Sequence, residues 1–279
     1  MTDGFATRVA KAVAATGPLC AGIDPSAELL AAWGLPDTPA GVRTFGLACV
    51  EAFAGVVPVV KPQVAFFERL GSGGIAALED VLAAARASGL IAIADAKRGD
   101  IGSTMEAYAS AWLDPASPLV ADAMTAVAYL GLGALHPAFD LAAAGGKGVI
   151  VVTRSSNPEG RALQTAITAS GLSVEDQLLA DIAALNHGGL EAPGSVGVVI
   201  GATLEPSAFD LGGLGGVVLA PGLGAQGGTA DDAGRRFGAC TPGTVLPSSS
   251  RALLAAGPDV GALRAAAHNE CEALRRVLG

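Results

Sequence analysis

Lysine and carboxylate side chains gather where apolar runs of this sequence end. The chain has 279 residues but only four lysines, and two of these, Lys61 and Lys97, stand at or just after such runs. Asp95 ends the apolar run that precedes Lys97, and Asp100 comes three residues after Lys97. Any one of these residues could be a solvated residue at the start of a loop. Together, at neighbouring strand ends, they indicate an array of alternating charge in which each ion favours the charged form of the next.

An array of this kind points to chemistry on an anionic substrate. Removing such ions from water costs several kcal/mol per ion, which stability alone rarely justifies. A lysine between two carboxylates stays protonated, so it is poorly suited to Schiff-base formation, which needs a neutral amine. Lys97 is therefore a candidate general acid toward a developing carbanion.

The elements that must position these residues alternate along the chain. Short β-branched or apolar runs alternate with longer stretches of helical period, which is the pattern of βα units around a parallel sheet. We expect an α/β fold, a single (β/α)8 TIM barrel over residues 1–279, with an open doubly wound sheet as the alternative. Strands are predicted at residues 19–24, 56–61, 90–95, 119–123, 148–153, 196–200, 216–220 and 244–247, and helices at residues 41–54, 74–88, 103–113, 174–186 and 259–277.

In such a barrel, catalytic side chains lie at the carboxyl ends of the strands. Asp24 ends the first predicted strand, Lys61 the second and Asp95 the third, and the eighth leads to Ser250 and Arg251. These strand ends are therefore where we expect the functional site.

The charge balance restricts the partners. Asp and Glu total 26 against 17 Lys and Arg, a formal charge of −9. This argues against nucleic acid or a membrane surface as a partner, because both are bound mainly through clustered Lys and Arg. The charge-free segment at residues 123–139 is shorter than the ~20 residues that cross a bilayer, and we interpret it as a buried helix and a turn. We find no signal peptide and expect a cytoplasmic protein.

Neither the cysteines nor the histidines show the spacing of a metal site. The cysteines lack a CxxC pair, and we expect reduced thiols. The histidines are scattered, so we predict no metal site. These residues are Cys20, Cys49, Cys240, Cys271, His136, His187 and His268.

The segment Asp95-Ala-Lys-Arg-Gly-Asp-Ile-Gly-Ser-Thr104 resembles the DxKxxDIxxT signature of the orotidine 5′-phosphate decarboxylase family. The resemblance extends over nearly the whole chain, although residues 161–191 match only loosely. Asp24 is similar to the family's ribose-binding Asp, and Lys61 to its strand-2 lysine. The segment 153–158 resembles the base-recognising segment, and the segment 221–228 resembles the phosphate loop. Further binding residues implied by the resemblance are Ser156, Pro221, Gly222, Gln226, Ser250 and the phosphate-binding Arg251.

The resemblance implies decarboxylation of orotidine 5′-phosphate to UMP and CO₂ without a cofactor. Lys97 would protonate C6, Asp95 would lie near the substrate carboxylate, and Lys61 would orient Asp95 and bind ribose. The resemblance also implies a homodimer in which Asp100, Ile101 and Thr104 enter the site of the partner subunit.

One further motif is disfavoured by its context, and two alternative functions remain open. Residues 222–227 also satisfy the GxGxxG dinucleotide fingerprint, but the chain ends before the further βαβ units that this motif needs. Glycines at a helix start serve a phosphate monoester equally well. A sugar-phosphate decarboxylase or aldolase that uses Mg²⁺ could share the DxKxxD pattern, and sensitivity to EDTA would favour it. The second alternative function is a non-catalytic nucleotide-binding barrel, although binding UMP would not require all of Lys61, Asp95, Lys97 and Asp100.

Overall fold

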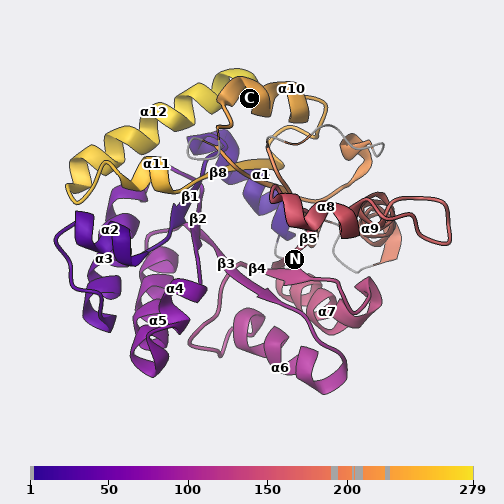
Figure 1. Cartoon of the computed structure of the whole chain (residues 1–279), viewed down its shortest axis with the longest axis horizontal. Coiled ribbons are helices and arrows are strands. Elements are labelled where there is room, and N and C mark those ends of the chain that lie inside the picture. Colours follow the sequence, from indigo (N-terminus) through magenta and orange to yellow (C-terminus); the bar gives the residue numbers. More distant parts are fainter. Residues whose placement is uncertain (1–2, 190–193, 203, 205–209, 224–226, 279) are drawn as a thin grey trace.

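Eight parallel strands close into a barrel in the computed structural model of the chain (Figure 1). The structure describes residues 3–189, 194–202, 204, 210–223 and 227–278. Each strand pairs with the next along the chain, and β1 pairs with β8 to complete the ring. The predicted (β/α)8 barrel is therefore confirmed. The strands are β1 (Cys20–Ile23), β2 (Val59–Pro62), β3 (Ile91–Arg98), β4 (Ala123–Val127), β5 (Gly148–Arg154), β6 (Val196–Ile200), β7 (Val218–Pro221) and β8 (Val245–Ser249).

Helices surround the strands and pack on the outside of the barrel (Figure 1). None of the helices in the described part of the chain is both long and apolar enough to cross a membrane. The α-helices are α1 (Phe5–Thr16), α2 (Ala27–Ala32), α3 (Pro39–Phe53), α4 (Ala65–Glu68), α5 (Gly71–Ala87), α6 (Gly102–Leu113), α7 (His136–Gly145), α8 (Arg161–Gln164), α9 (Val174–Ala184), α10 (Ala230–Phe237), α11 (Arg251–Leu254) and α12 (Val260–Leu278). Short 3₁₀ turns are η1 (Leu132–Leu135), η2 (Pro158–Gly160) and η4 (Leu211–Gly213), and η3 (Leu185–Gly189) is a π-helical turn.

Helix α1 closes the amino end of the barrel. Phe5, Val9 and Val13 recur every four residues, so they share one face of the helix. All three are buried in one cluster with strand residues that fill the barrel interior. Gly148 begins β5 beneath this helix, and a Cβ there would lie 2.4 Å from the Phe5 ring. The amino end is thus filled by side chains, which leaves the carboxyl end of the strands for the site.

The fourth strand differs from the prediction. The predicted strand at 119–123 is wrong, because β4 spans Ala123–Val127. The interpretation of residues 123–139 as a helix and a turn is also wrong for residues 123–127, which form β4. The rest of that segment contains η1 and the start of α7. The reason is Asp122, which forms an ion pair with Arg8 of α1 and accepts a hydrogen bond from the Ala92 amide. This charge is thereby held just before β4 begins.

The third strand is longer than predicted. It continues beyond Asp95 to Arg98, so Lys97 lies on the strand and not in the following loop. The cysteines agree with the prediction: all four are buried free thiols.

Candidate active site

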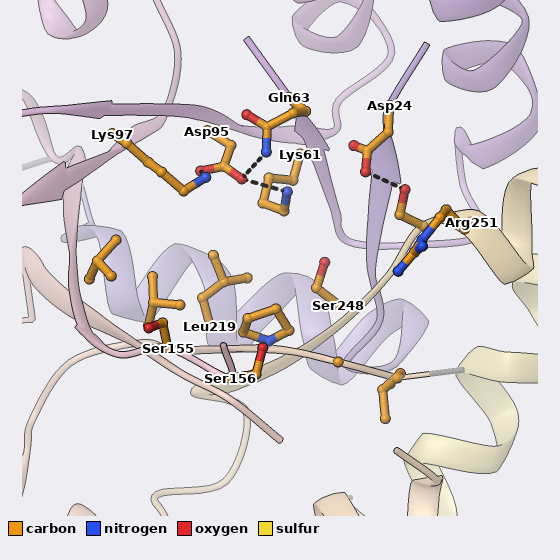
Figure 2. Close-up of a pocket in the computed structure, with 16 residues that line it drawn as sticks. Asp24, Lys61, Gln63, Asp95, Lys97, Ser155, Ser156, Leu219, Ser248 and Arg251 are labelled. Atoms are coloured by element: carbon orange, nitrogen blue, oxygen red, sulfur yellow. Dashed lines mark hydrogen bonds and ion pairs between the residues drawn. The ribbon is translucent and has the colours of Figure 1, made fainter. Parts of the chain in front are cut away.

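A cavity of about 310 Å³ opens at the carboxyl ends of the strands. Figure 2 shows Lys97 and Arg251 at opposite ends of one wall, with Ser155 and Ser156 facing that wall. Apolar side chains such as Val152, Val199 and Leu219 cover part of the lining. The polar residues of the lining are Asp24, Lys61, Gln63, Asp95, Lys97, Ser155, Ser156, Ser248, Ser250 and Arg251.

The Asp95 carboxylate lies at the centre of a hydrogen-bond network. Its Oδ2 accepts hydrogen bonds from Lys61 Nζ and from Gln63 Nε2, both at 2.9 Å. Its Oδ1 accepts hydrogen bonds from Lys97 Nζ at 2.7 Å and from Thr125 Oγ1 at 2.9 Å. Each oxygen therefore has two donors, which matches the capacity of an ionised carboxylate.

Charge pairing dominates the ionisation of this network. Burial alone would raise the pKa of Asp95, but the ammonium groups of Lys61 and Lys97 outweigh burial and hold that pKa well below its usual range. Burial alone would lower the pKa of Lys61, yet the carboxylates of Asp95 and Asp24 raise it above the ordinary lysine value. Asp95 and Lys61 are therefore ionised at neutral pH.

The two lysines differ in their freedom to move. The Lys61 side chain is only 8% exposed, whereas the Lys97 side chain is 49% exposed. Lys61 is thus a fixed charge, and Lys97 has room to reach into the cavity.

The backbone of β3 is distorted where it presents Lys97. Lys97 has φ +48°, and no other non-glycine residue in the described ranges has positive φ. This left-handed conformation costs a non-glycine residue roughly 1–2 kcal/mol. Gly99 follows because a Cβ there would lie 2.3 Å from the Val127 carbonyl oxygen of β4. Such strain is typical of functional sites, where the surrounding structure holds the outlier in place.

A second polar group lies at the β1 and β8 side of the cavity. Ser250 Oγ donates a 2.5 Å hydrogen bond to Asp24 Oδ2 (Figure 2). Gly22 of β1 makes this approach feasible, because a Cβ there would lie 2.7 Å from that of Ser250. The other oxygen, Asp24 Oδ1, is buried and has no hydrogen-bond partner among the described residues. Asp24 can therefore accept a hydrogen bond from a ligand hydroxyl.

Arg251 lies next to this group. It begins α11 directly after β8, lines the cavity and is exposed. It forms no ion pair with any residue that the structure describes. Its guanidinium is free to bind an anion.

Comparison with known proteins identifies this combination of barrel and site. Residues 17–266 match the model named "Orotidine 5'-phosphate decarboxylase / HUMPS family". The chain belongs to the orotidine 5′-phosphate decarboxylase / HUMPS family. It is 52% identical over 269 residues to the orotidine 5′-phosphate decarboxylase of Corynebacterium efficiens, covering 95% of each chain. It is 53% identical over 265 residues to that of Salinispora arenicola, again covering 95% of each chain.

Solved structures of this family share the fold. A crystal structure from Streptomyces avermitilis is 49% identical, with a TM-score of 0.94, and the match covers 99% of this chain and 96% of that one. The OMP decarboxylase of Leishmania donovani is 28% identical, with a TM-score of 0.76 and 98% of each chain covered. The predicted family membership is confirmed, and the name shared by these relatives is that of a carboxy-lyase.

Of the site residues predicted from the sequence, nine line the cavity, three do not, and one lies outside the described residues. Asp100, Ile101 and Thr104 lie beyond it, on the loop after β3 and the first turn of α6. Ile101 is 61% exposed, Thr104 is exposed, and the Asp100 carboxylate accepts a hydrogen bond from the Ile101 amide. Gln226 lies outside the described residues. The residues brought together are Asp24, Lys61, Asp95, Lys97, Ser156, Pro221, Gly222, Ser250 and Arg251.

Two partners of Asp95, Gln63 and Thr125, are not among the site residues predicted from the sequence. Gln63 lies two residues after Lys61, and this spacing puts both side chains on one face of an extended chain. That spacing was the available signal for Gln63. Thr125 is in the middle of β4, and the misplaced fourth strand concealed it. Ser248 also lines the cavity, whereas Ser249 is buried outside the lining.

The Asp95 network is ill suited to a divalent cation. Both oxygens of Asp95 already accept hydrogen bonds from ammonium groups, and a divalent cation there would be repelled by Lys61 and Lys97. Within the described ranges, no three His, Cys, Asp or Glu side chains are grouped as metal ligands.

Proposed function

We propose that this chain decarboxylates orotidine 5′-phosphate to UMP and CO₂ without a metal or organic cofactor. The observation that carries the proposal is the buried Asp95 carboxylate held between the ammonium groups of Lys61 and Lys97 at the edge of an open cavity. The matching family model names both orotidine 5′-phosphate decarboxylase and HUMPS, so the family alone does not decide the substrate. Relatives whose sequences are 52% and 53% identical to this chain are named orotidine 5′-phosphate decarboxylase, which favours that substrate.

The chemistry takes place at the Lys97 end of the cavity. With the orotate carboxylate beside Asp95, the two like charges repel each other, and the repulsion is relieved as CO₂ leaves. Lys97 donates a proton to C6 from its half-exposed side chain, and its charge stabilises the carbanion before that transfer. Lys61 stays in place, orients Asp95 and contacts the ribose.

The remainder of the substrate extends along the wall toward Arg251. Ser156 binds the pyrimidine, and the free Oδ1 of Asp24 accepts a hydrogen bond from a ribose hydroxyl. Arg251 binds the phosphate with the help of Ser250. The family resemblance implies that the loop at residues 222–228, of which residues 224–226 lie outside the described part of the chain, closes over the phosphate and contributes Gln226. Binding energy from this remote phosphate then supports the reaction at C6.

The active form is a two-fold dimer in which Asp100, Ile101 and Thr104 act in the site of the partner subunit. All three lie outside this chain's own cavity. Tyr129 and Leu130, on the loop after β4, are 80% and 56% exposed, and the close approach of Gly99 to Val127 puts that loop beside the loop that carries Ile101. Exposed apolar side chains on neighbouring loops favour an interface. We also expect a single domain located in the cytoplasm.

A substrate panel in the presence and absence of EDTA tests the proposal. We expect EDTA-resistant loss of orotidine 5′-phosphate absorbance and no turnover of pentulose or hexulose phosphates. EDTA-sensitive turnover of a sugar phosphate would instead support the Mg²⁺-dependent enzyme. Tight binding of UMP without turnover of orotidine 5′-phosphate would support a non-catalytic barrel.

A further inference from the structure

The pairing of β3 with β4 is irregular at the residues that carry the charge array. Ala94 pairs with Met124 and Arg98 with Ala126, so three residues of β3 oppose Thr125 alone. These three residues include Asp95 and Lys97, and the bulge contains the left-handed backbone of Lys97. A bulge re-aims side chains and leaves backbone groups without their regular partners. Something other than the ladder must therefore fix this segment.

The Thr125 hydroxyl provides that fixation. The Lys97 amide donates a 2.9 Å hydrogen bond to Thr125 Oγ1, which in turn donates a 2.9 Å hydrogen bond to Asp95 Oδ1. Asp95 Oδ1 also accepts a hydrogen bond from Lys97 Nζ, so the contacts form a closed ring that returns to the same lysine. One hydroxyl thus restrains both the backbone of Lys97 and the rotamer of the carboxylate that holds its ammonium group.

Thr125 is buried behind the residues that line the cavity. Its side chain has no exposed surface and is absent from the cavity lining. Water therefore cannot take over either hydrogen bond, and the substrate does not touch this residue. Removal of the hydroxyl would leave the buried Lys97 amide without its acceptor, and would leave Asp95 Oδ1 with Lys97 Nζ as its one remaining donor among the hydrogen bonds described above.

We propose that Thr125 is a positioning residue that holds Lys97 and Asp95 in the geometry for proton transfer to C6. The inference rests on the proposed decarboxylation. The Thr125 hydroxyl keeps the backbone of Lys97 fixed, while the half-exposed side chain of Lys97 reaches into the cavity. A misplacement of about 1 Å at a reacting group can lower a rate about a hundredfold, so the role of Thr125 should be visible in kcat.

The test compares Thr125→Val, which keeps the shape and loses the hydroxyl, with Thr125→Ser, which keeps the hydroxyl and loses a methyl group. For each we measure kcat and KM for orotidine 5′-phosphate, the Kd of UMP and the Tm. We expect Thr125→Val to lower kcat about 10- to 100-fold while KM and the Kd of UMP change less than about threefold. Thr125→Ser should keep kcat within about threefold of the wild type.

Three results would overturn the inference while the wild type remains active. These are an unchanged kcat in Thr125→Val, equal losses in the Val and Ser variants, or a loss confined to KM. If Thr125→Val does not fold, Thr125→Ala replaces it with the same expectations. A wild-type chain that is inactive on orotidine 5′-phosphate overturns the proposed function itself.

Discussion

Replacing Asp95 with alanine should destabilise the barrel as well as stop turnover. Asp95 lies 2.9 Å from Lys61, whose side chain is 8% exposed, so its removal leaves a buried ammonium group without its nearest counter-charge. At that separation and an effective dielectric of about 20, the attraction is about 6 kcal/mol before desolvation is subtracted. Breaking one half of a buried pair typically costs about 3–5 kcal/mol. We therefore expect a loss of about 3–5 kcal/mol and a Tm lower by roughly 6–20 °C.

Two comparisons isolate this effect. The double variant Lys61→Met with Asp95→Leu removes both buried charges and should recover most of the stability while staying inactive, because apolar replacements of buried pairs are often neutral or stabilising. Asp80→Ala breaks the exposed Arg43–Asp80 pair, whose side chains are both about half exposed. It should cost less than about 1 kcal/mol.

Urea denaturation of the four proteins, followed by circular dichroism, measures these differences. Equal stability of Asp95→Ala and Asp80→Ala would refute this expectation. A double variant less stable than Asp95→Ala would also refute it, since the unpaired Lys61 charge would then not be the cause of the destabilisation.

Three further predictions concern pH, phosphate and assembly. Because the pKa of Asp95 is lower in the folded than in the unfolded chain, its stabilisation is present above the unfolded value and lost in acid. The stability difference between wild type and Asp95→Asn should therefore be constant from pH 7 to 5 and shrink below about pH 4 in acid titrations. Arg251→Ala should lower kcat/KM about 10- to 100-fold for the whole substrate but not for one without phosphate, and equal losses would exclude Arg251 as the phosphate ligand. Mixed inactive Lys97→Ala and Asp100→Ala chains should recover activity through hybrid dimers with one intact site, whereas no recovery despite subunit exchange would contradict the shared site.

The ends of strands were the most predictable part of the site. Short apolar runs end at or just before Asp24, Lys61 and Asp95. In a (β/α)8 barrel, residues at the carboxyl ends of the strands lie at one end of the barrel, where the active site is found. The structure brings all three to the same cavity. Local sequence was sufficient here because strand order follows chain order in a closed barrel, so neighbours in sequence become neighbours in space.

The misplaced fourth strand had a non-local cause. An apolar run of four to eight residues does not distinguish a buried strand from a buried helix. The boundary depends on Asp122, whose partners are Arg8 and the Ala92 amide, far away in the sequence. The same error hid Thr125, because a residue outside the expected strand cannot be placed beside Asp95.

The closure of the amino end was also beyond local reasoning. Phe5, Val9 and Val13 have helical spacing, but α1 was not predicted, and its role arises from contacts with the barrel interior. The residues expected to act in the partner subunit remain predictions, since a single chain shows only that they lie outside its own cavity.

The most direct test of the central claim follows orotidine 5′-phosphate in parallel reactions of the wild type and Lys97→Ala, both with EDTA, and counts UMP and CO₂. We expect one CO₂ per UMP from the wild type. We expect a loss of about a thousandfold or more in Lys97→Ala, equivalent to at least ~4 kcal/mol of transition-state stabilisation, with the fold intact by circular dichroism. A wild type that forms no UMP, or a folded Lys97→Ala variant with near wild-type turnover, would contradict the proposed role of Lys97 in decarboxylation.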